Sequence, residues 1–378
     1  MANLKVVVPI LNKRISPVEN PADKSNIVGR VKMDFQFESI DEVTNTLGKW
    51  YRDRDGYYYW GGGVNEILAT DNAFPDEKFS FDISRVNWSI IDYGIDKIWK
   101  YSRGENVKIA IIDTGLNNNH TNISKKKNIE YYNIFNQSIN PEDCFDEEGH
   151  GTHCAGIIAA HGPEVYGVAP ASDLLIIKAT IKGSMECKDM ASAITSAVRL
   201  GADIISLSYH FFEKDFELEL VKTAVMNANN ADVLIVAASG NGSSVKMPDT
   251  YPASYSTSVG VGAIDQDKNL WKDTIINYNI DILAPGHNIE AMGIGNETVF
   301  IEGTSYATPY IAGVCALLMS YARNKNPDYI RDCLKNASSS KAEIQAQIQH
   351  LYDNPILVIP DLGIVNPIEI FNQLNYKM

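Results

Sequence analysis

Five short apolar runs rich in β-branched residues constrain the fold of this chain more than any other feature. They are VKIAIID (107–113), DLLIIKAT (173–180), ADIISLS (202–208), DVLIVAAS (232–239) and IDILAPG (280–286). Amphipathic stretches lie between them, among them MASAITSAVRLG (190–201) and ELELVKTAVMNAN (217–229). Continuous apolar strands that alternate with helices are typical of a parallel sheet covered on both faces. We therefore predict a doubly wound, mostly parallel α/β domain over residues 89–378.

The N-terminal part has a different pattern. The stretch KWYRDRDGYYYW (49–60) contains Asp55-Gly56 between two strand-forming runs, which predicts a β-hairpin. Its aromatic side chains either pack in a small core or form a ledge for a peptide or glycan. We predict a small all-β domain over residues 3–68 and a linker over 69–88. The linker aromatics are expected to dock on a neighbouring surface; they are Phe74, Phe79 and Phe81.

Charge, hydropathy and cysteine spacing exclude several classes of protein. A net charge of −14 argues against a nucleic-acid-binding surface. No apolar run approaches the ~20 residues that span a membrane, and the N-terminus does not resemble a secretion signal. The five cysteines are widely spaced and odd in number, which is typical of reduced thiols. We therefore expect a cytoplasmic protein, although export by another route stays open, and the oligomeric state is not predicted.

The stretch GHGTHC (149–154) places two histidines three positions apart, followed by a cysteine. These residue types could bind a metal, or one histidine could transfer protons for a nucleophile elsewhere in the chain. The six residues alone do not decide between the two alternatives.

Four polar residues fall where the predicted parallel sheet would bring them together. Asp113 ends one apolar run, Asn241 follows another between two glycines, and His150 and Ser305 precede apolar helical stretches. Each alone has an ordinary explanation as a cap or turn residue. Together they form the set that acyl transfer needs: a hydroxyl nucleophile, a base, a carboxylate that orients the base, and an amide donor for the oxyanion.

In their motifs, DTG, GHGTHCAG, SGNG and GTSYATP, these four residues resemble the subtilisin-like serine peptidases, in the same Asp, His, Ser order. The resemblance extends over about residues 88–374 and implies a serine endopeptidase that acts on proteins or peptides without a cofactor. It implies that Ser305 is the nucleophile, His150 the general base, Asp113 its orienting carboxylate and Asn241 an oxyanion donor. It also implies that the backbone near Ser208 and Gly240 pairs with an extended substrate.

The same resemblance bears on the other two residues of GHGTHC. His153 is expected to pack or cap within its helix, and Cys154 to be a buried thiol near the triad. No convincing third or fourth metal ligand accompanies the histidines, so we expect no metal at this position.

The chain departs from the family pattern at several places. Asn122 stands where many relatives have an acidic calcium ligand, and the loop AAHGPEVYGVAP (159–170) is short, so we expect no calcium dependence. His210 and Phe211 replace glycines of the specificity pocket, which predicts narrower or reshaped pockets. Acidic residues are expected to flank the cleft and favour basic substrates; they are Glu142, Asp143, Asp146, Glu147, Glu148, Glu213, Asp215, Glu217 and Glu219.

Residues 1–88 do not resemble the prodomain of secreted relatives. Their pattern, LNKRISPVENP…NIVGRV…WYRDRDGYYYW, is similar to bacterial SH3-like domains. This resemblance implies a small β-barrel that binds a peptide or a cell-wall ligand, or that regulates the peptidase. The alternative is a scaffold or binding protein whose peptidase domain is restrained and whose SH3-like domain is the working part.

Overall fold

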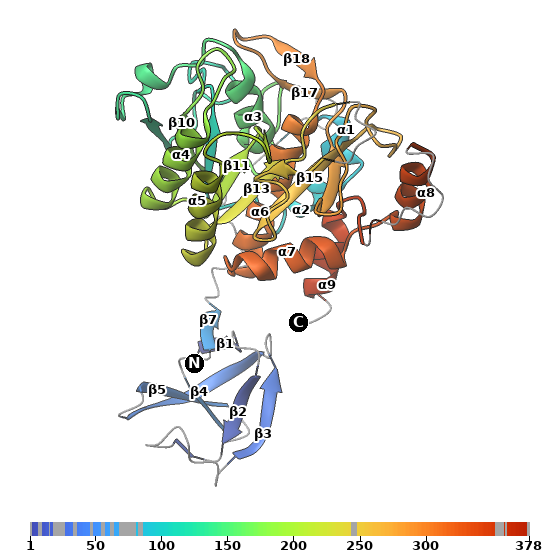
Figure 1. Ribbon diagram of the computed structural model, residues 1–378. Helices are drawn as coiled ribbons and strands as arrows, with labels where there is room; N and C mark the ends of the chain where they lie inside the picture. Colours follow the sequence, from blue (N-terminus) through green and yellow to red (C-terminus); the bar gives the residue numbers. More distant parts are fainter. Residues whose placement is uncertain are drawn as a thin grey trace. The chain divides into compact units, whose positions relative to one another are not determined.

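The computed structural model shows a chain that divides into two compact units, residues 1–79 with 373–378 and residues 80–372 (Figure 1). The described residues are 2–6, 10–14, 16–17, 27–32, 36–45, 48–53, 57–60, 64–67, 81, 86–242, 248–351, 359 and 361–375.

Seven strands of the first unit form one antiparallel sheet in the order β3-β2-β6-β5-β4-β1-β7. The strands are β1 (Ala2–Val6), β2 (Ile10–Arg14), β3 (Ile27–Lys32), β4 (Gln36–Asn45), β5 (Gly48–Asp53), β6 (Tyr58–Trp60) and β7 (Val64–Ile67).

The predicted hairpin is present as the antiparallel pair β5–β6, with Trp50 opposite Trp60 and Tyr51 opposite Tyr59. The Asp55-Gly56 turn lies outside the described residues. Tyr59 and Trp50 are buried, which favours the packing alternative for these two rings, whereas Tyr57 and Tyr58 are half-buried.

The second unit is built on a seven-stranded parallel sheet in the order β16-β15-β13-β11-β8-β10-β9. Its strands are β8 (Lys108–Asp113), β9 (Ile129–Asn133), β10 (Asp173–Lys178), β11 (Ile204–Leu207), β13 (Leu234–Ala238), β15 (Ser258–Ile264) and β16 (Ile282–Pro285). The five predicted apolar runs each contain one of these strands. Two strands lie outside those runs: β9, which carries tyrosines and a glutamate at the sheet edge, and the glycine-interrupted β15.

Helices cover both faces of this sheet, as the alternating pattern predicts (Figure 1). Helices α4 (Cys187–Arg199) and α5 (Leu218–Asn230) pack against each other on one face, and α3 (His150–Ala159) and α6 (Thr304–Ala322) pack against each other on the other. The middle of β8 is buried from both sides, with Ile109, Ile111 and Ile112 at most 1% exposed. Each such side chain contributes about 1.5–3 kcal/mol to folding, which fixes the strand that ends at Asp113.

Smaller elements complete the second unit. Two short antiparallel pairs lie beside the main sheet, β12 (Phe211–Phe212) with β14 (Thr250–Tyr251) and β17 (Ile289–Met292) with β18 (Thr298–Ile301). The remaining helices are α1 (Trp88–Ile91), α2 (Ile95–Ile98), the 3₁₀ helix η3 (Pro141–Cys144), α7 (Pro327–Asn336), α8 (Lys341–Leu351) and α9 (Pro367–Asn375).

Of the three predicted linker aromatics, only Phe81 lies within the described residues. Its ring packs edge-on against Trp99, with the centroids 4.9 Å apart, and lies 6.2 Å from the ring of Tyr166. Phe81 therefore docks on the second unit, as expected for an apolar side chain in a connecting segment.

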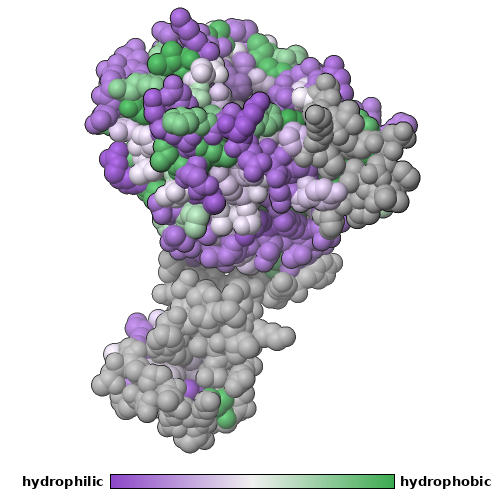
Figure 2. All heavy atoms as spheres, viewed as in Figure 1, coloured by the Kyte–Doolittle hydropathy of each residue, from purple (hydrophilic) through white to green (hydrophobic). Residues whose placement is uncertain are grey.

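Hydrophilic residues dominate the face of the second unit that Figure 2 shows, and hydrophobic residues appear between them in smaller groups. Among the described helices, none is both long and apolar enough to cross a membrane.

Candidate active site

The predicted site residues all lie at the carboxyl edge of the parallel sheet. Asp113 is the last residue of β8, Ser208 follows β11, and Gly240 and Asn241 follow β13. His150 is the first residue of α3, and Ser305 lies in the first turn of α6. Because parallel strands end at one edge, residues that are far apart in the chain meet there.

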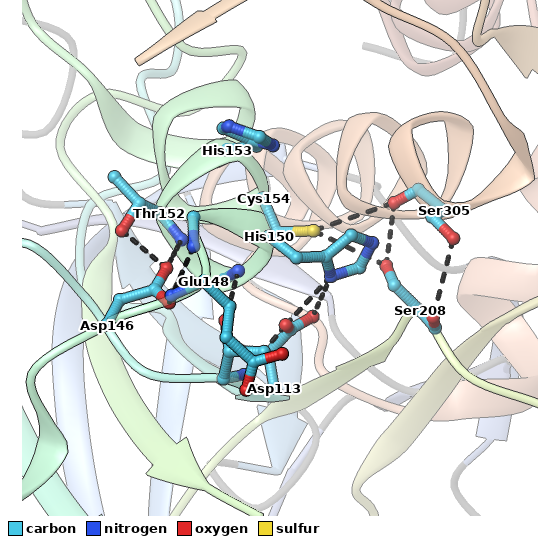
Figure 3. A network of polar contacts seen from close by, with 12 residues as sticks. Asp113, Asp146, Glu148, His150, Thr152, His153, Cys154, Ser208 and Ser305 are labelled. Atoms are coloured by element: carbon cyan, nitrogen blue, oxygen red, sulfur yellow. Dashed lines mark hydrogen bonds and ion pairs between the residues drawn. The ribbon is translucent and has the colours of Figure 1, made fainter. Parts of the chain in front are cut away.

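Asp113 and His150 form the central contact of the site (Figure 3). Nδ1 of the imidazole donates to the carboxylate, 2.8 Å from Oδ1 and 2.9 Å from Oδ2. The backbone N–H of Thr114 donates a further bond to Oδ1, at 2.8 Å. Burial alone would lower the pKa of His150, but the charge of Asp113 and its hydrogen bond raise that pKa above the usual value, with smaller contributions from Asp146 and Glu148. The carboxylate thus fixes the tautomer that leaves Nε2 free to accept a proton.

Asp146 fixes the start of the helix that carries His150, a role that the sequence reasoning missed. Its buried carboxylate accepts bonds from four donors: the N–H groups of Glu148 and Gly149 on Oδ1, and the N–H and hydroxyl of Thr152 on Oδ2. Burial alone would raise the pKa of Asp146, yet these bonds lower it. Asp146 lies four positions before His150, outside the N-cap position that Gly149 occupies, so no local capping signal marks its role.

Ser305 lies beside Ser208 and Cys154 (Figure 3). Its hydroxyl donates a long bond of 3.4 Å to the carbonyl oxygen of Ser208, and its own carbonyl oxygen accepts a 2.7 Å bond from the Ser208 hydroxyl. The thiol of Cys154 lies 3.6 Å from both Ser208 Oγ and the Ser305 carbonyl oxygen. Ser208 and Cys154 therefore fix the backbone of the first turn of α6 through the carbonyl oxygen of Ser305.

Asn241 is oriented by Thr304, the residue before Ser305. Its Oδ1 accepts bonds from the Thr304 N–H at 3.0 Å and from the Thr304 hydroxyl at 2.8 Å. An N–H group can only donate, so the amide oxygen must face Thr304 and the amide nitrogen must face the other way. A Cβ on Gly303 would come within 3.1 Å of that nitrogen. The Asn241 amide nitrogen thus lies beside Gly303, the residue just before α6.

A cavity of about 330 Å³ opens next to Ser305. It is lined by Ser208, Tyr209, His210, Gly240, Asn241, Thr304 and Ser305. The predicted nucleophile, oxyanion donor and both predicted substrate-binding residues therefore border one space.

Of the two residues that replace family glycines, only His210 lines this cavity. Phe211 is 7% exposed and pairs with Tyr251 in the β12–β14 ribbon. The expectation that Phe211 narrows the pocket is wrong, because alternation along the strand turns its side chain away from His210 and into the interior.

His153 lies one helical turn after His150, and the rings of both histidines lie near the ring of Tyr306. Its Nδ1 is 3.4 Å from the hydroxyl of Tyr306, and its ring centroid is 5.9 Å from that of Tyr306. The ring of His150 lies 5.5 Å from Tyr306 on centroids. Burial lowers the pKa of His153, and the positive charge of His150 adds to this. His153 packs against Tyr306, and the charges of Asp146, Asp113 and Glu297 offset only part of the lowering of its pKa.

Three possible metal ligands do lie close together: ligand atoms of Asp113, His150 and Cys154 lie within 4.8 Å of one another. The donor set does not fit a metal ion, however. Burial raises the pKa of the Cys154 thiol well above its usual value, so a metal would have to displace a tightly held proton to bind the thiolate. The Asp113 carboxylate is already bonded to His150 Nδ1. These residues are better suited to proton transfer.

At the position predicted to lack calcium, Asn122 is fully buried and binds the chain itself. Its Oδ1 accepts bonds from the N–H groups of Glu164 and Val165, at 2.8 and 3.2 Å, and so holds the short 159–170 loop. Burial and the charges of Lys126 and Lys125 lower the pKa of His161 in this loop. The amide oxygen that would bind a cation at this position is therefore already in use by the loop.

At least two of the acidic residues predicted to flank the cleft accept hydrogen bonds from residues nearby in the chain. Asp146 is buried under α3, and Asp215 accepts the N–H of Phe212 within its own turn. None of the nine acidic residues lines the cavity beside Ser305. The preference for basic substrates stays a prediction, without support from this cavity.

Known proteins with similar sequences are serine proteases. A family model described as the subtilase family matches residues 104–352. The "Intracellular serine protease" of Paenibacillus polymyxa is 37% identical, over 62% of this chain and 72% of that protein. Subtilisin DY of Bacillus licheniformis is 32% identical, over 66% and 92%. The solved structure of the prenylagaramide maturation protease PagA aligns with a TM-score of 0.62 and 26% identity, covering 74% of this chain and 98% of that one.

Replacing Asp146 tests its role as the anchor of α3. Because its pKa is lowered in the folded state, its stabilising contribution is present above the unfolded-state pKa of about 3.9 and is lost as the pH falls through the folded value. Asp146→Asn should lower the free energy of unfolding by about 2 kcal/mol at pH 7. Melting curves from pH 7 to 3 should show this deficit shrinking below about pH 4. Glu147→Gln, at an exposed neighbour, is the control; an equal deficit at every pH would contradict the assignment.

Removing divalent cations tests the interpretation of Asn122. A chelator should leave both the activity and the melting temperature nearly unchanged. Ligands bound tightly to the folded state must raise its stability. A fall of many degrees on chelation that calcium reverses would therefore reveal a site that this account lacks.

Proposed function

Because the chain belongs to the subtilase family of serine proteases, which hydrolyse peptide bonds, we propose that Asp113, His150 and Ser305 form its catalytic triad and that Asn241 is an oxyanion donor. The observation that carries this proposal is the double contact of His150 Nδ1 with the buried Asp113 carboxylate, on a ring that lies beside Ser305 (Figure 3). Ser305 and Asn241 in turn border one cavity. The substrate is a protein or peptide.

In the proposed mechanism, Ser305 Oγ attacks the carbonyl carbon of the substrate while its proton passes to Nε2 of His150. The Ser305 hydroxyl must first rotate from the Ser208 carbonyl, where its bond is long and easily exchanged. Asp113 stabilises the imidazolium that forms. His150 then protonates the leaving amine as the C–N bond breaks. In the second half-reaction His150 accepts a proton from the water that attacks the acyl-enzyme, and it returns that proton to Ser305 Oγ as the bond to the acyl group breaks and the acid leaves.

The negative charge of the tetrahedral intermediate would be held by Asn241 Nδ2 and the backbone N–H of Ser305. The amide oxygen of Asn241 is occupied by Thr304, so only its donor end is available. The Ser305 N–H lies in the first turn of α6, where backbone donors have no helical acceptor and the helix dipole favours negative charge. The backbone near Ser208 and Gly240 would pair with the extended substrate on either side of this point.

We also propose that residues 3–68 are an SH3-like module that regulates or targets the peptidase, joined to it by the 69–88 segment. The antiparallel sheet of the first unit is compatible with such a module, and its ligand would be a peptide or a cell-wall component. The docking of Phe81 on Trp99 gives that segment a fixed point on the second unit. Five free cysteines, and the word intracellular in the name of the Paenibacillus relative, support a cytoplasmic location.

Triad variants test the central assignment. Ser305→Ala and His150→Ala should each lower kcat by several orders of magnitude, and the double variant should be little worse, because the residues act as a unit. Asn241→Ala should cost about 10²–10³ in kcat. His153→Ala serves as the matched control and should retain substantial activity. If the losses in kcat of the two single variants add up in the double variant, the assignment is wrong.

Labelling with a fluorophosphonate probe separates the peptidase from the restrained-scaffold alternative. The full chain should label, and Ser305→Ala should not. A folded full chain that fails to label, and that labels only after proteolysis, would instead favour the scaffold in which the N-terminal module is the working part.

Truncation tests regulation by the N-terminal module. A chain that begins at Ser80, the first residue of the second unit, keeps Phe81 and its packing. If the module restrains the peptidase, this chain should show a higher kcat/KM than the full chain with an unchanged melting transition of the second unit. Equal values would leave the module with a targeting role only.

A further inference from the structure

The imidazole of His210 stands directly over Gly240 in the cavity beside Ser305. A Cβ placed on Gly240 would lie 2.9 Å from Cε1 of the ring and 3.0 Å from each ring nitrogen. The edge of the ring that carries both nitrogens therefore occupies the space that a side chain at position 240 would take. Gly240 also has a φ of 94°, so a larger residue there is excluded on two grounds.

Aromatic packing fixes this ring from behind. The ring of Phe212 meets it edge-on, with centroids 5.2 Å apart and an interplanar angle of 89°. Phe212 is itself fixed by pairing with Thr250 and by its bond to Asp215. Among the hydrogen bonds of the described residues, none involves a ring nitrogen of His210, a half-buried residue that lines the cavity. Packing against Phe212 therefore fixes the imidazole, and no described residue forms a hydrogen bond with its ring nitrogens.

A bound substrate must bring one residue against this edge. The attacked carbonyl carbon has to lie about 3 Å from Ser305 Oγ, with its oxygen toward Asn241. The residue that carries this carbonyl therefore enters the same cavity, whose lining also includes Tyr209, His210 and Gly240. We call this residue the acyl residue of the substrate.

The wall acts on the acyl side chain in two ways. The imidazole takes up space, which excludes long or aromatic side chains. It also offers an N–H donor and a nitrogen acceptor that lose contact with water when the cavity fills. A site built to hydrogen-bond a substrate group discriminates against an analogue that lacks it, because its own polar atoms are then left unpaired.

We propose that His210 is a specificity-determining residue that selects short polar side chains, such as asparagine or serine, at the acyl residue of the substrate. This inference rests on the proposed function of Ser305 and adds the substrate class to it.

Peptides that differ only at the acyl residue test the proposal. Asparagine and leucine are nearly isosteric, so their ratio reports polarity, whereas phenylalanine reports space. Dissociation constants are measured with the full-length Ser305→Ala protein, and kcat/KM with the intact protein. We expect the asparagine peptide to bind at least tenfold more tightly than the leucine peptide. Phenylalanine should bind more weakly still.

Two substitutions at position 210 separate the two effects. In His210→Gly, the asparagine-to-leucine ratio should fall to within about threefold and binding of the phenylalanine peptide should rise about tenfold or more. In His210→Phe, which keeps a ring without nitrogens, the asparagine preference should vanish while phenylalanine stays excluded. His287→Gly, at an exposed histidine that does not line the cavity, is the control and should leave the ratios unchanged.

Equal binding of the asparagine and leucine peptides in the His210 background, or ratios unchanged in both His210 variants, would overturn the proposal. The binding readout needs no turnover. An intact chain that binds with the expected pattern but does not cleave would therefore contradict the catalytic assignment and leave the role of His210 standing.

Discussion

The contact between the Asp113 carboxylate and the His150 imidazole is the constraint on which the rest of the site depends. Asp113 ends a strand buried on both faces, and the residue is only 5% exposed. The charge of its carboxylate must therefore be compensated by donors within the protein. The N–H groups of Thr114 and of the His150 ring provide that compensation. Because β8 is held by its buried isoleucines and α3 by Asp146, neither partner can move away without exposing apolar surface or unpairing a buried carboxylate.

The two buried carboxylates divide the work. Asp146 accepts only donors of its own segment and helix, so its charge fixes backbone geometry. Asp113 accepts a titratable donor, so its charge sets the pKa and tautomer of a side chain at the cavity. A similar division holds for amides: the oxygen of Asn122 fixes a loop, and that of Asn241 fixes the direction in which its nitrogen points. Asp146 and Asn122 thus fix the backbone, whereas Asp113 and Asn241 form hydrogen bonds with groups of the candidate site.

Periodicity was enough to predict the doubly wound sheet, because β-branched runs separated by amphipathic helices have few other ways to bury their surface. Strand-end position and motif order predict that Asp113, His150, Asn241 and Ser305 lie at one edge of the sheet, and their roles stay a proposal. What the sequence did not reveal depends on contacts between distant segments. The pairing of Phe211 with Tyr251 and the approach of Cys154 to Ser208 have no local pattern, and β15 is weakened as a signal by its glycines. Asp146 is expected from the sequence among the acidic residues that flank the cleft, because nothing local indicates its bonds to Thr152, six residues further on.

The most direct test of this account is the titration of His150 followed by NMR, with the His150 and His153 signals assigned from substitutions of each. The account predicts a pKa for His150 above the usual value of about 6.5, a pKa for His153 below it, and a fall in the His150 pKa in Asp113→Asn. A His150 pKa below the usual value, or one that Asp113→Asn leaves unchanged, would contradict the claim that the Asp113 carboxylate controls this imidazole.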